Sequence, residues 1–227
     1  MDGFYWWSLI LLAPALVLGL YAQARVSSSF NKYSQIASRR GLTGAEAARQ
    51  LLDSAGLNDV GIEVAGSRLS DHYDPRTRTL TLSPPVGQSN SLAALGVAAH
   101  ETGHAMQHAE GYAAFRLRSA IVPVANLGSN LGFILFFFGL IFYRNGLLMS
   151  LGIILYSAAV LFTIVTLPVE FNASKRAVTL LENRSILMGE ELDGAKKVLS
   201  AAALTYVAAA LMAMLQLLRL ILISRRD

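Results

Sequence analysis

The chain has 227 residues, of which 54% are hydrophobic, and its mean hydropathy is +0.46. This composition is too apolar for an ordinary soluble domain of this length and favours a membrane protein. The net charge of +4 does not come from a basic cluster of the kind that binds nucleic acid, and the absence of cysteine leaves His, Asp and Glu as the side chains able to hold a metal.

Four stretches contain no Asp, Glu, Lys or Arg, and they cover residues 3–24, 119–143, 145–169 and 198–218. Each is long enough to cross a hydrocarbon core, which takes about 20 apolar residues. The first could instead be a signal peptide, because Ala22-Gln23-Ala24 resembles a cleavage site. A signal peptide has a basic start, whereas here the first charge is Asp2, which favours an uncleaved anchor.

Basic residues are concentrated in the two polar segments between the spans. Of the 19 Lys and Arg residues, ten lie in 25–118 and five lie in 169–197. An excess of Lys and Arg marks the cytoplasmic side, and two spans separate these segments, so both are expected in the cytoplasm with both termini outside. Arg219, Arg225 and Arg226, beyond the fourth span, run against this orientation.

After the first span, residues 28–40 have the composition of a short polar helix. Thr43 and Glu46 form a capping box, which predicts a helix that begins there and runs to about Ser54 before Gly56 ends it. Alternation of apolar and small or polar residues predicts strands over 60–65 and 79–83.

A longer helix is predicted to start at the cap candidates Ser89, Asn90 and Ser91 and to run through Gln107. Further along, Pro168 is expected to end the third span, and residues 169–183 are predicted to form a helix. A last helix over 190–222 is expected to run into the fourth span.

The predicted helix that ends near Gln107 contains the sequence His100-Glu101-Thr102-Gly103-His104. On a helix, His100 and His104 lie one turn apart on one face, so both imidazoles can bind one zinc ion. Glu101 projects beside them and can act as general base toward a water activated by zinc. The alternative is an ordinary helix with a polar face, but the apolar lead-in 92–99 makes buried His and Glu costly unless they have partners.

A catalytic zinc needs a third protein ligand and one open position. His108 is two turns from His100, about 12 Å along a straight helix, which is too far for one ion, so we interpret it as a supporting residue. Glu170 is the better candidate. An acid so close to the hydrocarbon is costly unless it is bound, although a carboxylate stabilised by a helix N-terminus is the alternative.

The motif Ala99-His100-Glu101-Thr102-Gly103-His104, followed by Glu170-Phe171-Asn172-Ala173-Ser174, resembles the gluzincin layout of the HtpX and CAAX-prenyl-protease group. Over nearly the whole chain the sequence resembles more closely the bacterial YugP-like family of neutral zinc metallopeptidases. The resemblance implies a zincin-like fold, Zn²⁺ as cofactor, Glu170 as third ligand and Glu101 as base. Ser174 departs from the HtpX pattern, which has an Asp there to orient a zinc histidine.

His72 and Tyr73 precede the second predicted strand, which in a zinc peptidase would lie beside the cleft and pair with an extended substrate. Either residue could donate a hydrogen bond to the developing oxyanion. The alternative is a turn histidine that is hydrogen-bonded to its own loop. The sequence alone leaves these interpretations open.

Together these features predict a mainly α membrane protein with four transmembrane helices and a small α+β zincin-like domain. Residues 1–24 are expected to form an anchor, 25–118 a catalytic domain and 119–168 a two-helix hairpin. Residues 169–197 are expected to form a helical segment with the third ligand, and 198–227 a last span. The expected function is a zinc metalloendopeptidase of the bacterial cell (inner) membrane. It would contact the lipid bilayer and cleave membrane-associated proteins or peptides at the cytoplasmic side.

The main alternative is a non-catalytic membrane scaffold that zinc stabilises, but such a protein has no use for Glu101. A metal transporter would place ionisable groups within its spans, and the four charge-free stretches lack them.

Overall fold

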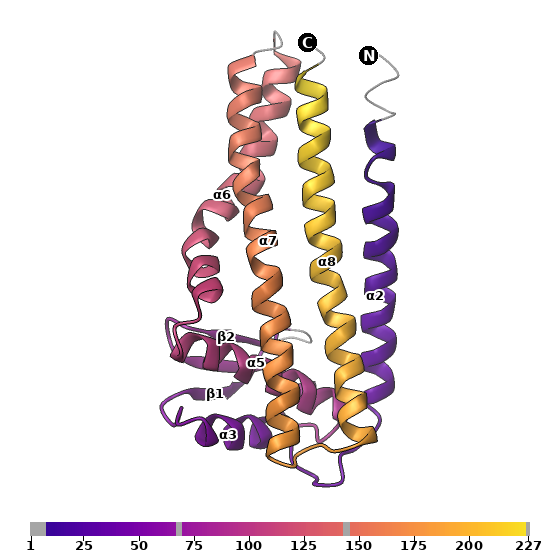
Figure 1. The fold of residues 1–227 in the computed structure, drawn as a ribbon, viewed down its shortest axis with the longest axis vertical. Helices are drawn as coiled ribbons and strands as arrows, with labels where there is room; N and C mark the ends of the chain where they lie inside the picture. The colour runs from indigo at the N-terminus through magenta and orange to yellow at the C-terminus, as the bar shows by residue number, and fades with distance from the viewer. Residues whose placement is uncertain (1–7, 67–69, 143–145, 226–227) are drawn as a thin grey trace. The chain divides into compact units, whose positions relative to one another are not determined.

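The computed structural model of this chain describes residues 8–66, 70–142 and 146–225. Four of its helical segments are long and apolar enough to cross a membrane: Ser8–Tyr33, Ala113–Ile141, Gly146–Asn183 and Glu190–Ser224. Figure 1 labels the corresponding helices α2 (Ala13–Tyr33), α6 (Ala113–Ile141), α7 (Gly146–Asn183) and α8 (Glu190–Ser224). The prediction of a mainly helical protein with four candidate spans is confirmed.

The chain forms two compact units. The first, which we call the span unit, contains residues up to Ala22 together with Arg116–Pro168 and the chain from Thr205 onward. The second, which we call the site unit, contains Gln23–Phe115 and Val169–Leu204. Helices α2, α6, α7 and α8 each contribute residues to both units. The finer division into five segments stays a prediction.

Pro168, expected at the end of the third span, does not separate that span from the predicted helix over 169–183. Helix α7 continues through it to Asn183, as the unbroken ribbon in Figure 1 shows. Proline inside a helix removes one backbone hydrogen bond, but membrane helices tolerate it because their remaining backbone bonds are retained in an apolar surrounding. Pro123 lies inside α6 in the same way. Glu170 therefore belongs to the long helix that begins in the span unit.

The expected helix over 28–40 is wrong in its second half. Helix α2 ends at Tyr33. The chain then pairs with residues at the start of the helix that contains His100 and His104, which we call the motif helix. Ala37 forms a bridge with Ser91, and the Leu92 N–H donates to the Ile36 carbonyl at 2.9 Å. Pairing with a distant segment thus overrides the local helical composition.

Within the span unit, α6 and α7 approach closely at glycines. A side chain at Gly132 would lie 2.9 Å from the Gly152 carbonyl oxygen, and one at Gly152 would lie 2.6 Å from the Phe136 amide nitrogen. Small residues of this kind allow membrane helices to pack backbone against backbone. Beside them, Phe136, Met149, Leu220 and Ile223 form a small apolar core.

The site unit contains one three-stranded sheet in the order β1 (Gly61–Val64), β3 (Thr79–Leu82), β2 (His72–Asp74). Strand β1 is parallel to β3, and β2 is antiparallel to it, with Tyr73 opposite Leu80. Strand β2 was not predicted, because a three-residue strand is too short to show an alternating pattern. Leu80 and Leu82 are fully buried, which fixes the face of the sheet that meets the core.

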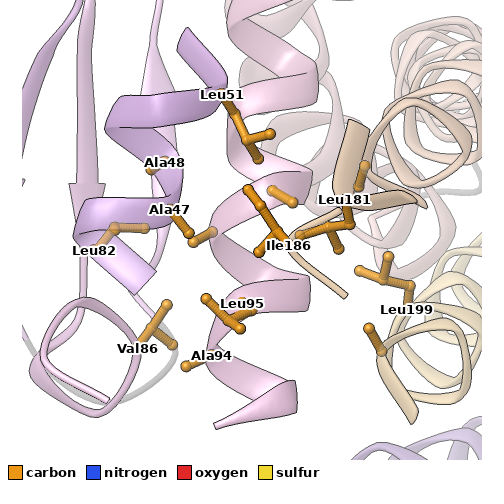
Figure 2. Packing of buried hydrophobic residues seen from close by; sticks show 14 of the residues in the cluster. Ala47, Ala48, Leu51, Leu82, Val86, Ala94, Leu95, Leu181, Ile186 and Leu199 are labelled. Atoms are coloured by element: carbon orange, nitrogen blue, oxygen red, sulfur yellow. The ribbon is translucent and has the colours of Figure 1, made fainter. Parts of the chain in front are cut away.

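Helices α3 (Gly44–Ser54), α4 (Pro84–Gly87) and α5 (Leu92–Ala109) complete the unit. The predicted capping box is present, with Thr43 accepting from the Glu46 N–H and the Glu46 carboxylate accepting from the Thr43 N–H. Figure 2 shows side chains from α3, α5, α7 and α8 meeting around Leu95. This core packs the first half of α5 against residues of α3, α7 and α8.

Candidate metal centre

The motif helix α5 begins at a good cap and is fixed by its apolar first half. The Ser91 hydroxyl, at the N-cap, accepts a hydrogen bond from the Ala94 N–H at 3.2 Å. Leu92, Ala93, Ala94, Leu95, Ala98 and Ala99 are buried in the core of the site unit. The two turns that carry His100 and His104 therefore follow a segment whose position is set by packing.

Gly103 allows α5 and α7 to touch at the level of the motif. A β-carbon at Gly103 would lie 2.8 Å from the Ala173 carbonyl oxygen and 3.2 Å from its Cα. Real side chains do not approach backbone this closely, so any larger residue would separate the two helices. The close contact brings the motif face of α5 against the turn of α7 that carries Glu170.

His100, His104 and Glu170 converge at this contact. The His100 Nε2 lies 3.2 Å from the Glu170 Oε2, and the His104 Nε2 lies 3.6 Å from the same oxygen. One ligand atom from each of the three residues lies within 4.8 Å of the others. Glu170 is 1% exposed, so its carboxylate faces the two imidazoles rather than water.

These separations fit a zinc ion. With metal–ligand bonds of about 2.1 Å and tetrahedral angles, neighbouring ligand atoms lie about 3.4 Å apart. The two measured separations, 3.2 and 3.6 Å, lie on either side of that value. His and carboxylate ligands also suit zinc in a chain without cysteine. The residues present can therefore hold the metal that the motif predicts.

The outer nitrogens of both imidazoles are occupied by hydrogen bonds. The His100 Nδ1 lies 3.1 Å from the Ser174 hydroxyl oxygen, and the His104 Nδ1 lies 3.0 Å from the Gln107 side-chain oxygen. An imidazole that donates from Nδ1 presents the lone pair of Nε2, which is the form that binds metal. Ser174, which stands where the HtpX pattern has an Asp, contacts the imidazole of His100.

Without a metal, the negative charges at this site favour the protonated form of His104. Burial by itself lowers the pKa of His104, but hydrogen bonding to the Glu170 carboxylate and the nearby charge of Glu101 outweigh burial, so the pKa is raised above its ordinary value. The same negative charges that favour a proton also favour a divalent cation. Protons and metal therefore compete for this site.

Glu101 lies next to His100 on α5 and is buried, with 8% of the residue exposed. It is not one of the residues whose ligand atoms converge. Its negative charge is one of the causes that raise the pKa of His104, which lies three residues further along α5. This arrangement leaves Glu101 available for proton transfer.

The two oxyanion candidates have different surroundings. Tyr73 is buried, and its hydroxyl lies 2.9 Å from the Nδ1 of His108, on the turn of α5 that follows His104. Burial raises the pKa of Tyr73, so the phenol stays protonated and can donate near neutral pH. His72 is exposed, and its Nδ1 lies 2.7 Å from the Ser70 carbonyl oxygen, as in the turn-histidine alternative.

His108 is not among the converging ligand atoms of the described residues, in agreement with its interpretation as a supporting residue. Its ring lies 5.9 Å from that of Phe115, which lies 6.1 Å from the ring of His104. The Phe115 ring therefore packs against both His104 and His108.

Sequence reasoning missed three polar residues at the site: Gln107, Asn172 and Arg176. Gln107 is three residues after His104, on the same helical face, which was the available signal. Asn172 and Arg176 are four residues apart on α7 and follow Glu170, but nothing in their spacing indicated that they meet α5.

Comparison with known proteins agrees with these observations. The profile of the family described as "Putative neutral zinc metallopeptidase" matches residues 8–225. The chain is 48% identical over 215 residues to "Putative membrane protease YugP" of Bacillus subtilis (strain 168), covering 95% of each chain. No solved structure matches significantly. Since the family profile covers nearly the whole chain, this protein belongs to the "Putative neutral zinc metallopeptidase" family.

Proposed function

We propose that this protein is a membrane-embedded zinc metalloendopeptidase of gluzincin type, in which His100, His104 and Glu170 hold the metal. The observation that carries the proposal is the convergence of two Nε2 atoms on one buried carboxylate oxygen, at 3.2 and 3.6 Å. A buried carboxylate beside two imidazoles is costly unless a cation satisfies all three groups. Membership of the family supports zinc as that cation.

Bound zinc would supply a Lewis acid that polarises the scissile carbonyl and makes hydroxide available near neutral pH. Glu101 would accept the proton of the attacking water and then deliver it to the leaving amine, since it lies beside the ligand cluster without belonging to it. The two histidines would stay in place, because Ser174 and Gln107 hold the outer nitrogens of their imidazoles.

For the oxyanion we propose a hydrogen bond from Tyr73 rather than His72. Tyr73 is protonated at neutral pH, and its contact with His108 directs its hydroxyl toward the motif helix. His72 is exposed and already in contact with its own loop. An oxyanion donor must be held in place before the charge develops, and Tyr73 meets that condition better.

The substrates we propose are membrane-associated proteins or peptides, cleaved at the cytoplasmic side of the bacterial cell (inner) membrane. Glu170 lies two residues after Pro168 on a helix that qualifies as a membrane span. A ligand so close to the apolar part of α7 favours substrates that are held at the bilayer. The relative from Bacillus subtilis is likewise named as a membrane protease.

Removal and return of the metal test this function. Purified protein in detergent or lipid should contain about one zinc per chain and cleave casein or an unstructured peptide. Dialysis against 1,10-phenanthroline should abolish cleavage, and stoichiometric Zn²⁺ should restore it. Cleavage that survives full zinc removal, measured by metal analysis on the same sample, would contradict the proposal.

The same contacts would also suit a zinc ion that only fastens α5 to α7, which is the scaffold alternative. A scaffold would lose thermal stability on zinc removal but would show no zinc-dependent cleavage in the wild type. The two functions are therefore separated by assaying cleavage and unfolding on the same zinc-free and zinc-restored samples.

The proposed orientation puts the site unit in the cytoplasm and the segment between α6 and α7 outside. Because the chain has no cysteine, single cysteines can report this in intact cells. Asn145→Cys should react with an impermeant maleimide, whereas Asn58→Cys, at an exposed position of the site unit, should react only after lysis. The opposite pattern would reverse the orientation.

A further inference from the structure

A chain of hydrogen bonds connects His104 to an ion pair on the far side of the α5–α7 contact. The His104 Nδ1 meets the Gln107 Oε1 at 3.0 Å, and the Gln107 Nε2 donates to the Asn172 Oδ1 at 2.9 Å and to the Val169 carbonyl at 2.8 Å. The Arg176 Nε donates to the same Asn172 oxygen at 2.7 Å. All of these residues lie in the site unit.

The direction of every bond in this chain follows from two groups with a single possible role: the Arg176 guanidinium, which can only donate, and the Val169 carbonyl, which can only accept. Arginine can only donate, so the Asn172 atom that faces Arg176 must be its oxygen. The Gln107 group that faces this oxygen, and also the Val169 carbonyl, must then be its NH₂. The Gln107 oxygen is consequently left to face His104, and the His104 Nδ1 must donate to it.

Arg176 is itself held in one orientation. Its two terminal nitrogens bind the two carboxylate oxygens of Glu110 at 2.6 and 2.7 Å, and the pair lowers the pKa of Glu110. Glu110 is the C-cap of α5, whereas Arg176 belongs to α7. The ion pair thus joins the two helices that carry the ligand candidates, and a bidentate pair fixes the guanidinium plane.

We propose that Arg176, through Asn172, acts with the Val169 carbonyl to hold the Gln107 amide in one orientation, which keeps the proton of His104 on Nδ1 and so holds its Nε2 ready for the metal. This inference rests on the proposed metal site. Gln107 and Arg176 are positioning residues in it, because neither touches the metal position or the substrate. Gln107 is fully buried, which makes its hydrogen-bond pattern hard to exchange for water.

The hydrogen-bond chain also distinguishes the two histidines, because the partners of their Nδ1 atoms differ in what they can donate or accept. The Nδ1 of His100 meets a hydroxyl, which can donate or accept and so leaves the tautomer open. The Nδ1 of His104 meets an oxygen whose role is set by its neighbours. Of the two histidines, His104 is therefore the one whose tautomer is set by its hydrogen-bond partners.

The test is a ¹H–¹⁵N spectrum of full-length protein labelled with ¹⁵N-histidine, in micelles, recorded zinc-free and zinc-loaded. The wild type should show a downfield, exchange-protected Nδ1–H resonance in both states, assigned to His104 by its loss in His104→Gln. Gln107→Leu should remove the protection and weaken zinc binding by about 10–100-fold, the usual effect of losing a residue that orients a metal ligand.

Arg176→Met tests the remote end, where the residue does not contact the histidine. It should make the His104 Nδ1–H exchange faster and weaken zinc binding in the same direction as Gln107→Leu. Arg176→Lys keeps a group that can only donate and should restore the protected resonance. Lys175→Met, which removes the same charge from an exposed neighbouring position, should change neither readout.

The inference is overturned if the Nδ1–H resonance of His104 is missing from the wild type, or if it and the zinc affinity are unchanged in Arg176→Met. Should Gln107→Leu fail to fold, Arg176→Met still decides. The proposed function fails by a different result, namely zinc binding in the wild type that does not require His100, His104 and Glu170. The zinc-free resonance of His104 can be read in either case.

Discussion

Glu101→Gln is expected to lower the rate of peptide cleavage by about 10²–10⁴-fold, the contribution of a positioned general base, while zinc stays bound. The amide has nearly the shape of the carboxylate but cannot accept the proton of the attacking water. Glu101 is outside the group of converging ligand atoms, so its loss should leave the metal ligands in place. Cleavage of a quenched fluorescent peptide and zinc content by atomic absorption measure the two effects.

Glu63→Gln is the matched control, because it changes a carboxylate that is exposed on β1 of the same unit. It should cleave at the wild-type rate. If Glu101→Gln also kept the wild-type rate while it contained full zinc, the general base would have to be another group. Loss of zinc in Glu101→Gln would instead assign Glu101 to the metal.

Glu170→Gln is expected to lose zinc and cleavage together. The Glu170 carboxylate is the group on which both imidazoles converge, and a zinc held by two histidines alone lacks its third protein ligand. The affinity should fall by more than the about 10–100-fold that is typical for losing a residue that only orients a ligand. Zinc retained after dialysis against a series of chelators of increasing strength measures the loss.

Glu182→Gln, an exposed carboxylate further along α7, provides the control and should retain full zinc. Comparison with Glu101→Gln gives the sharper test, since one variant should keep metal without activity and the other should lose both. Full zinc in Glu170→Gln would mean that the third ligand lies elsewhere, with His72 or His108 as the remaining histidines.

The sequence by itself determined the membrane class and the two-histidine motif. Charge-free stretches fix where a chain can cross a membrane, because a charge in hydrocarbon is costly wherever the rest of the chain lies. The i, i+4 spacing of His100 and His104 fixes their common face, because helical geometry is local. The cap of α3 at Thr43 was predicted correctly for the same reason.

Only the tertiary structure decided which segments of the chain pack against α5. The pairing of Ala37 with Ser91 overrode a local helical preference, and α7 continued through Pro168 because a single lost backbone bond does not break a long apolar helix. The contact of Gly103 with Ala173 determined how closely α5 and α7 approach and which of their turns face each other. That contact joined the pair His104 and Gln107 on α5 to the pair Asn172 and Arg176 on α7. The bond that links the two pairs, from Gln107 to Asn172, spans 65 positions and leaves no periodic pattern in a sequence.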